Sequence, residues 1–318
     1  MSTFVKYVVN EYNRKDFSEN LSRIKDAGFD GVFISSTKSM SMPDAAKWRS
    51  DFLPVSRMVD LAREKGLKTG VILVCFHSPS LWNQDSFSPP VGISGAAYVP
   101  DDWYHPICPN NPTGLEYFYR LIDKMARISA PDYFYLEYLR FPFFWEKEEL
   151  DVQNRVPPFC YCPFCVTEFS SVVGEIITSP QQIIEMMPEW LQWRSTTVFN
   201  AIVDAKQTLG KNSKLIISLP PLALIDLPFT TGQLPLAITD EGCFVSPYLH
   251  HEQKKKNLMW VEDLLDQYRL DMKIRKIIPC FEASTRKELD KYISWTRENV
   301  FPGVIFHEWS KLRDNLQV

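Results

Sequence analysis

The chain has 318 residues, of which 45% are hydrophobic and 14% aromatic, and its formal net charge is −4. This balance lacks the basic surface that nucleic-acid binding needs, and no apolar stretch reaches the roughly 18–20 residues of a membrane span. The N-terminal segment MSTFVKYVVNEYN also lacks the pattern of a secretory signal. We therefore expect a cytoplasmic protein that binds neither nucleic acid nor a membrane. The sequence leaves the oligomeric state open, a homo-oligomer included.

Short apolar runs, several of them rich in Val, Ile and Phe, recur along the chain without regular alternation. Continuous runs of this kind are typical of parallel strands that are buried on both faces. We predict eight such strands: Phe4–Val9, Gly31–Ser35, Lys68–Phe76, Tyr133–Leu139, Lys214–Leu219, Gly242–Pro247, Ile274–Cys280 and Gly303–His307.

Segments with helical spacing of apolar residues separate these runs. Gly28 and Gly66 follow the first two segments, and glycine is typical of the position after a helix. The predicted helices are Lys15–Ala27, Leu53–Lys65, Thr113–Ile128, Pro188–Leu209, Leu258–Leu270 and Lys287–Asn299.

Strands that alternate with helices predict an α/β fold with a parallel sheet. Eight strand units in 318 residues favour one (β/α)8 TIM barrel over residues 1–318, with a doubly wound open sheet as the alternative. No G-x-G-x-x-G follows the first strand, which argues against dinucleotide binding. The connections 77–112 and 143–187 are unusually long. Both follow strands, so we expect them at the catalytic face of the barrel.

The segment CYCPFC places Cys160, Cys162 and Cys165 close together, and Cys108 lies in the other long connection. Structural zinc takes four tetrahedral ligands, so these four thiolates predict a structural Zn²⁺ that joins the two loops. Four thiolates would saturate the ion, and we expect no catalytic cofactor. His105 is an alternative ligand. Unliganded surface or core cysteines and a redox pair are alternative interpretations.

The remaining cysteines, Cys75, Cys243 and Cys280, fall inside predicted strands and are expected in the core. The total of seven is odd, which argues against a disulfide framework.

Glu137 ends the apolar strand in YFYLEYLRFP. A carboxylate there is costly unless it is paired or used, and the carboxyl ends of barrel strands are where catalytic residues lie. We interpret Glu137 as catalytic. Arg140, three residues later, is a candidate for substrate binding, and a structural pair between Glu137 and Arg140 is the alternative.

Two further carboxylates also end apolar strands, Glu282 in IIPCFEAST and Glu308 in VIFHEWS. Glycosidic cleavage needs a pair of carboxylates across one pocket. We expect the fourth and seventh strands on opposite sides of the barrel, which favours Glu282 over Glu308 as the partner of Glu137. With Glu282 as that partner, Glu308 would contact substrate. A helix-capping role is the alternative for Glu282.

Histidine and aromatic side chains gather at the same predicted strand ends. His77 ends the third strand, Tyr248 and His250 follow the sixth, and Trp309 follows Glu308. A lone histidine is more often structural, but this clustering makes His77, Tyr248, His250 and Trp309 candidates for substrate binding. Aromatic rings there would stack on the faces of a sugar.

The segments HPICPNNP, YLEY, CYCPFCVTEF and EWLQWR together resemble the catalytic barrel of glycoside hydrolase family 42, the zinc-carrying β-galactosidases. The resemblance covers residues 104–209. It implies Cys108, Cys160, Cys162 and Cys165 as zinc ligands, Glu137 as the acid/base and Glu282 as the nucleophile.

This chain departs from the family pattern at one informative position. Leu136 stands where the family has an Asn before the acid/base. The run LEYLRFP is also similar to the LDYIRFP strand of poorly characterised glycosidase-like barrels, which keep the acidic residue and the Arg together. The resemblance therefore implies a divergent member of this wider group.

The sequence thus predicts a glycoside hydrolase of the retaining type that acts on a carbohydrate. One rival is a noncatalytic carbohydrate-binding barrel, which the departure at Leu136 favours. A second rival is a metal-dependent hydrolase, but the first strand lacks the H-x-H that such an enzyme would be expected to carry.

Overall fold

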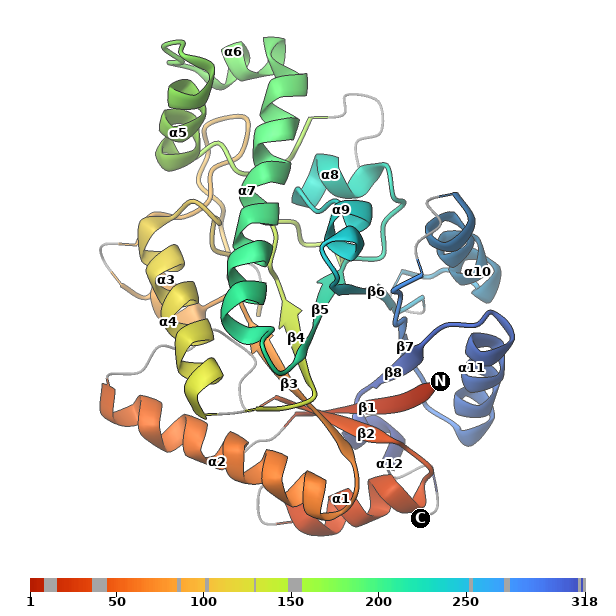
Figure 1. Ribbon diagram of the computed structural model, residues 1–318. Coiled ribbons are helices and arrows are strands. Elements are labelled where there is room, and N and C mark those ends of the chain that lie inside the picture. The colour runs from red at the N-terminus through yellow and green to blue at the C-terminus, as the bar shows by residue number, and fades with distance from the viewer. Residues whose placement is uncertain are drawn as a thin grey trace.

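Eight parallel strands close into a barrel in sequence order, from β1 round to β8, in the computed structural model (Figure 1). The structure describes residues 1–8, 16–35, 45–84, 87–100, 103–128, 130–147, 156–251, 254–271, 275–313 and 316. The predicted (β/α)8 barrel is confirmed. The strands are β1 Ser2–Val8, β2 Gly31–Ser35, β3 Lys68–Val74, β4 Tyr133–Glu137, β5 Lys214–Leu219, β6 Phe244–Leu249, β7 Cys280–Glu282 and β8 Gly303–His307.

Seven of the eight strand predictions hold to within about two residues at either end, and the exception is β7. We predicted Ile274–Cys280, whereas β7 is Cys280–Glu282. Pro279 has no backbone N–H to donate to a neighbouring strand, so the regular parallel pairing of β7 begins only after it. The chain before it still follows β6, because Ile278 N donates to Val245 O at 2.9 Å. Val9, Lys15 and Ile274 lie outside the described residues.

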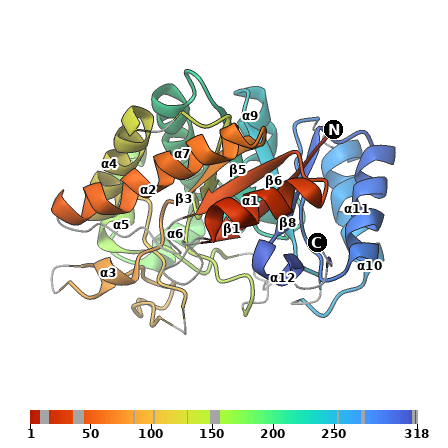
Figure 2. The same ribbon diagram turned by 90° about the horizontal axis from the view of Figure 1, so that it is seen from below.

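Helices connect the strands and surround the barrel, as the view from below shows (Figure 2). Each predicted helix corresponds to an observed one. The helices are α1 Phe17–Asp26, α2 Ala45–Glu64, α3 Pro79–Trp82, α4 Pro112–Ile128, α5 Pro163–Val173, α6 Pro180–Glu185, α7 Met187–Leu209, α8 Asp226–Thr231, α9 Pro235–Asp240, α10 Leu258–Asp266 with the π-helical turn η1 Gln267–Asp271, α11 Arg286–Glu298 and α12 Trp309–Arg313. No helix among the described residues is long and apolar enough to cross a bilayer.

Alternate residues of each strand face opposite sides of the barrel wall. The inner side chains form one apolar cluster that includes Phe4, Phe33, Tyr135 and Ile305, while their sequence neighbours pack against the helices. Gly70 makes room inside, because a Cβ there would lie 2.2 Å from the Phe33 ring. Nearer the carboxyl ends of the strands, several of the side chains that face the inside of the barrel are polar.

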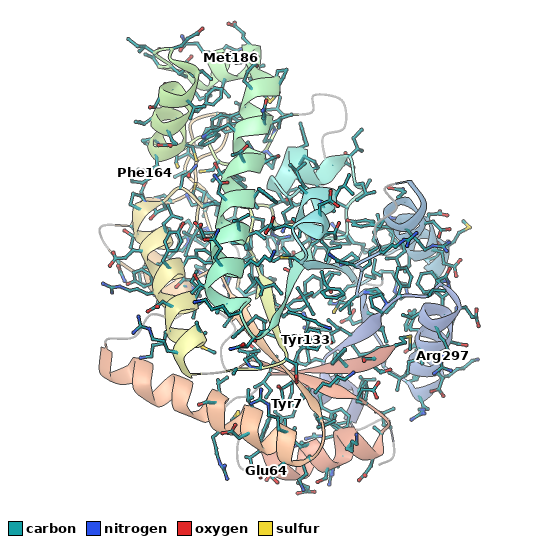
Figure 3. The ribbon with its side chains drawn as sticks, in the orientation of Figure 1. Tyr7, Glu64, Tyr133, Phe164, Met186 and Arg297 are labelled. Atoms are coloured by element: carbon teal, nitrogen blue, oxygen red, sulfur yellow. The ribbon has the colours of Figure 1, made fainter. Side chains whose placement is uncertain are left out.

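Helices α5 and α6 and the first half of α7 extend beyond the carboxyl ends of the strands (Figure 1). Phe164 of α5 and Met186, between α6 and α7, mark this end, and Glu64 of α2 marks the other (Figure 3). The buried Arg194 of α7 fastens the extension to the barrel, since it donates to the carbonyl oxygens of Phe159 and Thr230 at 2.5 and 2.8 Å. Residues 156–187 of the second long connection therefore build a rim above the barrel.

Candidate active site

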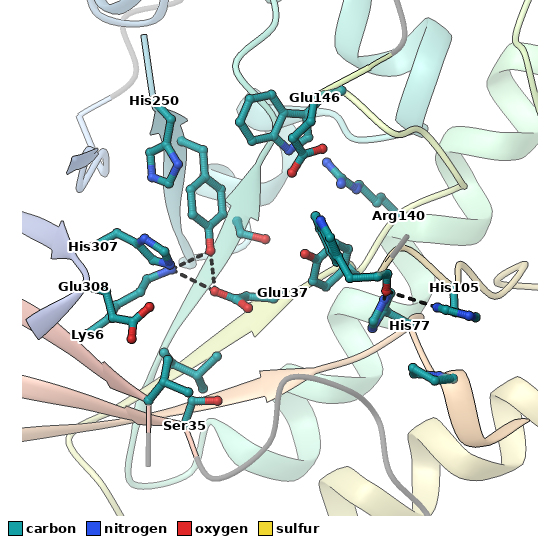
Figure 4. Close-up of a pocket in the computed structure, with 18 residues that line it drawn as sticks. Lys6, Ser35, His77, His105, Glu137, Arg140, Glu146, His250, His307 and Glu308 are labelled. Carbon is teal, nitrogen blue, oxygen red and sulfur yellow. Dashed lines mark hydrogen bonds and ion pairs between the residues drawn. The ribbon is translucent and has the colours of Figure 1, made fainter. Parts of the chain in front are cut away.

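A cavity of about 560 Å³ opens at the carboxyl ends of the strands. This is within the usual size of a small-ligand site. Ten of the lining side chains are labelled in Figure 4. The cavity is lined by Lys6, Val8, Ser35, Ile72, His77, Pro79, Trp103, His105, Glu137, Tyr138, Arg140, Trp145, Glu146, Ser218, Tyr248, His250, His307 and Glu308.

Glu137 lies at the floor of this cavity and is held by two donors from other strands. Lys6 Nζ on β1 is 2.7 Å from Glu137 Oε1, and the Tyr248 hydroxyl on β6 donates to the same oxygen (Figure 4). Lys6 Nζ also donates to the Tyr248 hydroxyl at 2.5 Å. The three side chains therefore fix one another, and Glu137 has a defined orientation.

Lys6 is 1% exposed, and its ammonium lies 3.9 Å from the centre of the Tyr135 ring and 4.3 Å from that of Tyr248. Burial by itself lowers the pKa of Lys6, but interactions with Cys280, Glu137 and Tyr135 raise it above its ordinary value. Burial and the Glu137 carboxylate raise the pKa of Tyr248. Near neutral pH the carboxylate thus faces an ammonium and a neutral phenol.

Arg140 lines the cavity but does not pair with Glu137. Its guanidinium lies over the ring of Tyr138, at 5.3 Å from the centroid. Among the described residues, the ion pair of Glu137 is with Lys6. The alternative that we drew from the sequence, a Glu137–Arg140 pair, is therefore wrong, because a lysine from β1 takes that position.

Glu308 lines the cavity directly after β8 and accepts a hydrogen bond from Ser310 Oγ at 2.7 Å. The closed strand order places β8 four strands from β4 in either direction, so β8 lies opposite β4. We expected β7 there, which is only three strands away. Glu137 and Glu308 both point into the cavity (Figure 4).

Glu282 is not among the residues that line the cavity. Its Oε1 forms an ion pair of 2.6 Å with Lys311 of α12, and its side chain is 13% exposed. Glu282 pairs with His307 of β8 in the parallel ladder. The preceding residue, Phe281, pairs with Leu249 of β6, so Glu282 also lies beside His250. Ligand atoms of these three residues lie within 4.8 Å of one another. They could also hold a metal ion.

Trp309 does not contact the cavity, so its interpretation as a substrate-binding residue is wrong. It begins α12, is 1% exposed, and donates from Nε1 to Asn20 Oδ1 of α1 at 3.0 Å. The chain turns into a helix directly after Glu308, which directs the indole toward α1. Leu136 likewise points away from the cavity, into the layer between strands and helices.

The connection after β3 builds an aromatic wall of the cavity. It folds back beside the strand end, where Ile107 N donates to Phe76 O at 3.0 Å. His77 Nε2 is 2.9 Å from Trp103 O, and the His77 ring stacks on Tyr138 at 5.1 Å. Trp103 is 41% exposed. This wall offers flat apolar surfaces next to polar side chains, as sugar binding requires.

The four predicted cysteines converge, as the sequence analysis expected. Cys108, Cys160, Cys162 and Cys165 are buried, and their sulfur atoms all lie within 4.8 Å of one another. The Sγ–Sγ distances from Cys108 are 3.2 Å to Cys165 and 3.7 Å to Cys162. Four sulfurs at about 2.3 Å from one tetrahedral ion would be roughly 3.8 Å apart. The group could therefore hold a metal ion.

Backbone and side-chain N–H groups surround these sulfurs. Asn110 donates to Cys108 Sγ from its backbone N at 3.4 Å and to Cys165 Sγ from Nδ2 at 3.5 Å, and Val91 N donates to Cys160 Sγ at 3.4 Å. Such donors suit anionic sulfur. Burial raises the pKa of the Cys108 and Cys165 thiols. A cation at the centre would offset that cost.

The cysteine cluster lies where the two long connections meet. Tyr161 N donates to Val91 O at 2.8 Å, and Gly92 pairs with Phe159 in an antiparallel bridge. The cluster therefore joins the loop after β3 to the loop after β4, as predicted. Cys75, Cys243 and Cys280 are buried elsewhere, which confirms their assignment to the core. Residues 148–155 of the second connection lie outside the described part of the chain.

Several residues that line the cavity were not predicted from the sequence. Lys6 carried a usable signal, since a lysine inside the apolar run FVKYV is costly unless paired. Five more belong to the long loops or follow Glu137 directly, and their direction depends on the path of the loop: Trp103, His105, Tyr138, Trp145 and Glu146.

The buried His77 should make stability depend on pH. Burial lowers its pKa from 6.5 to about 4. The unfolded chain therefore binds this proton first, and stability should fall as pH drops from about 6.5 to 4, by up to about 3 kcal/mol. We expect His77→Gln to remove this part of the slope in urea unfolding measured across that range. Identical pH slopes for the two proteins would contradict it.

No protein family model and no curated protein matches this chain. Solved structures do match it. The glycoside hydrolase domain of PgaB (BpsB) from Bordetella bronchiseptica has a TM-score of 0.71 at 10% identity, over 96% of this chain and 94% of that chain. The catalytic domain of β-amylase from Paenibacillus polymyxa has a TM-score of 0.65 at 12% identity, over 98% and 93%.

A β-galactosidase from the haloarchaeon Halorubrum lacusprofundi has a TM-score of 0.69 at 11% identity. The match covers 97% of this chain and 52% of that chain, so this chain spans about half of its length. At these identities the likeness shows the fold. The structural neighbours of this chain are thus TIM barrels of glycoside hydrolases.

Proposed function

We propose that this protein is a glycoside hydrolase that uses Glu137 and Glu308 as its two carboxylates. The observation that carries the proposal is the position of Glu137, at the floor of the cavity and fixed by Lys6 and Tyr248. Glu308 lines the same cavity from the opposite strand. Two carboxylates on opposite sides of a pocket are what glycosidic cleavage needs. The barrels of known glycoside hydrolases that resemble this chain support the same function.

The contacts of Glu137 favour a role as the charged partner. An ammonium at 2.7 Å and a phenol hydroxyl both stabilise the negative form of the carboxylate. This suits a nucleophile better than a proton donor. Glu308 would then protonate the leaving oxygen and later activate water. The family 42 resemblance implies the reverse for Glu137, and the two assignments give different labelled residues in a trapping experiment.

Glu282 is the alternative second carboxylate, as the same resemblance implies. Its ion pair with Lys311 and its place outside the cavity lining favour Glu308 instead. A noncatalytic carbohydrate-binding barrel is the second candidate function, which the departure at Leu136 favours.

We also propose that the ion held by the four cysteines is structural Zn²⁺. Four thiolates fill its tetrahedral coordination and leave no position for water, so the metal would take no part in the reaction. Its role would be to fix the two long connections that carry Trp103 and Trp145 into the cavity wall.

Replacement of the carboxylates tests the proposed reaction. Glu137→Gln and Glu308→Gln should each lower kcat on activated aryl glycosides by about 100-fold or more, because the first removes the proposed nucleophile and the second the acid/base, whose catalysis contributes that much. Glu282→Gln should retain most of the activity. A panel of p-nitrophenyl glycosides gives the rates, and thermal unfolding checks the fold. Undiminished turnover by Glu137→Gln would refute the assignment, and sugar binding without any hydrolysis would favour the noncatalytic candidate.

Trapping tests the two roles. With a 2-deoxy-2-fluoro glycoside of the sugar that the protein hydrolyses, a retaining enzyme accumulates a glycosyl-enzyme. We expect peptide mass spectrometry to locate the sugar on Glu137. Lys6→Met should lower kcat more than it changes KM, because it removes a contact to the reacting carboxylate. A label on Glu308 or Glu282 would reverse or replace the roles, and release of the inverted anomer would exclude retention.

Loss of a zinc ligand should separate stability from chemistry. Cys165→Ser should lower the zinc content from one per chain and destabilise the fold by about 4 kcal/mol or more. Cys243→Ser is the matched control, since Cys243 is buried but lies outside the cluster. Elemental analysis and urea unfolding measure the two effects. Full zinc content in Cys165→Ser would contradict the four-cysteine site.

A further inference from the structure

Arg140 is a buried cation that the proposed reaction does not use. It follows β4, is 6% exposed, and its side chain points into the cavity (Figure 4). Its Nε is buried and has no hydrogen-bond partner among the described residues. The ion pairs between described residues do not include Arg140 either. A buried guanidinium without a counter-ion is strongly unfavourable.

The acidic side chains around the cavity do not neutralise Arg140. Glu137 is bound by Lys6 and Tyr248, and Glu308 lies across the cavity and accepts from Ser310. Glu146 belongs to the same wall as Arg140, yet no ion pair joins the two among the described residues. No acidic side chain in the described part of the chain forms an ion pair with Arg140, so an anion from outside the chain could take that place.

The surroundings of Arg140 leave the guanidinium able to receive such an anion. One face of the group lies over Tyr138, with the centroid at 5.3 Å, which supports a planar cation without using its N–H groups. Those N–H groups form a fork that matches carboxylate and other planar or tetrahedral oxyanions. Trp103 and Trp145, which also line the cavity, provide apolar surface beside it.

We propose that Arg140 binds an anionic group on the substrate, so that the cavity takes an acidic sugar. The group is a carboxylate, as in a uronic acid, or a sulfate ester, since both offer paired oxygens to a guanidinium. The inference rests on the proposed function only in taking the ligand to be a sugar. The anion-binding role of Arg140 stands on its burial, its place in the cavity lining and the absence of an ion pair with any described residue.

Direct binding tests this without any need for hydrolysis. Quenching of Trp103 and Trp145 fluorescence reports ligands in the cavity. The probes are D-glucuronate, D-galacturonate and glucose 6-sulfate, each compared with D-glucose or D-galactose at constant ionic strength. We expect at least one acidic sugar to bind about 10- to 100-fold more tightly than its neutral parent, the range of a hydrogen-bonded charge. Sodium sulfate alone should compete weakly.

Variants assign the preference to Arg140. Arg140→Gln should remove the preference, and Arg140→Lys should keep part of it, because the charge remains while the fork is lost. Lys147→Gln is the matched control, an exposed cation on the same loop, and should keep the whole preference. Arg140→Gln should unfold at the same temperature as wild type or higher, since it removes an unpaired buried charge.

Three results would overturn the proposal: neutral sugars that bind as tightly as acidic ones, a preference that survives Arg140→Gln, or no binding of any acidic probe. Sodium sulfate as tight as the acidic sugars would reduce the site to an adventitious ion only. These binding assays are independent of the aryl glycoside assays. A negative result for Arg140 therefore leaves the assignment of Glu137 intact, and a negative result for Glu137 leaves anion binding by Arg140 intact.

Discussion

Two opposite charges, on Lys6 and Glu137, meet inside a barrel whose inner side chains are otherwise mostly apolar or aromatic. Each would be costly to bury alone. Together they fix the floor of the cavity and bring in Tyr248 as a third member. The pair also affects the charges around it, because Glu137 is paired with Lys6 and the described residues offer Arg140, three residues along the chain, no ion pair.

Most of the fold could be predicted, and the reason lies in how barrel strands are built. Strands that are covered on both faces read as continuous apolar runs, so their number and order follow from the sequence. Strand β7 was displaced because Pro279 interrupts the ladder inside an apolar run. The same patterns placed Glu137, His77, Tyr248 and His250 at the cavity, since each of them ends or follows a strand and faces inward.

What could not be predicted depends on which side of a strand or loop a residue faces. Trp309 and Glu308 are neighbours, yet one lies in the core and the other in the cavity, because the chain turns into α12 between them. The expectation that the seventh strand lies opposite the fourth was a geometric error, because a closed barrel of eight strands in sequence order places the eighth strand there. The cysteine cluster could be predicted because three of its four cysteines lie close together in the sequence. The fourth, Cys108, lies in the loop that neighbours theirs.

Without a bound ion, the cysteine cluster would make the rim a place where oxidation could form a disulfide. Cys108 and Cys165 come from different connections, and their sulfurs are 3.2 Å apart. A bound ion keeps such thiolates occupied. Without it, an oxidant would meet two thiols already close to bonding distance, and a covalent link there would lock both loops in whatever arrangement they held. A bound metal ion would thus protect the thiolates from oxidation. Its supply during folding would decide whether the two loops are joined by the metal or by a disulfide.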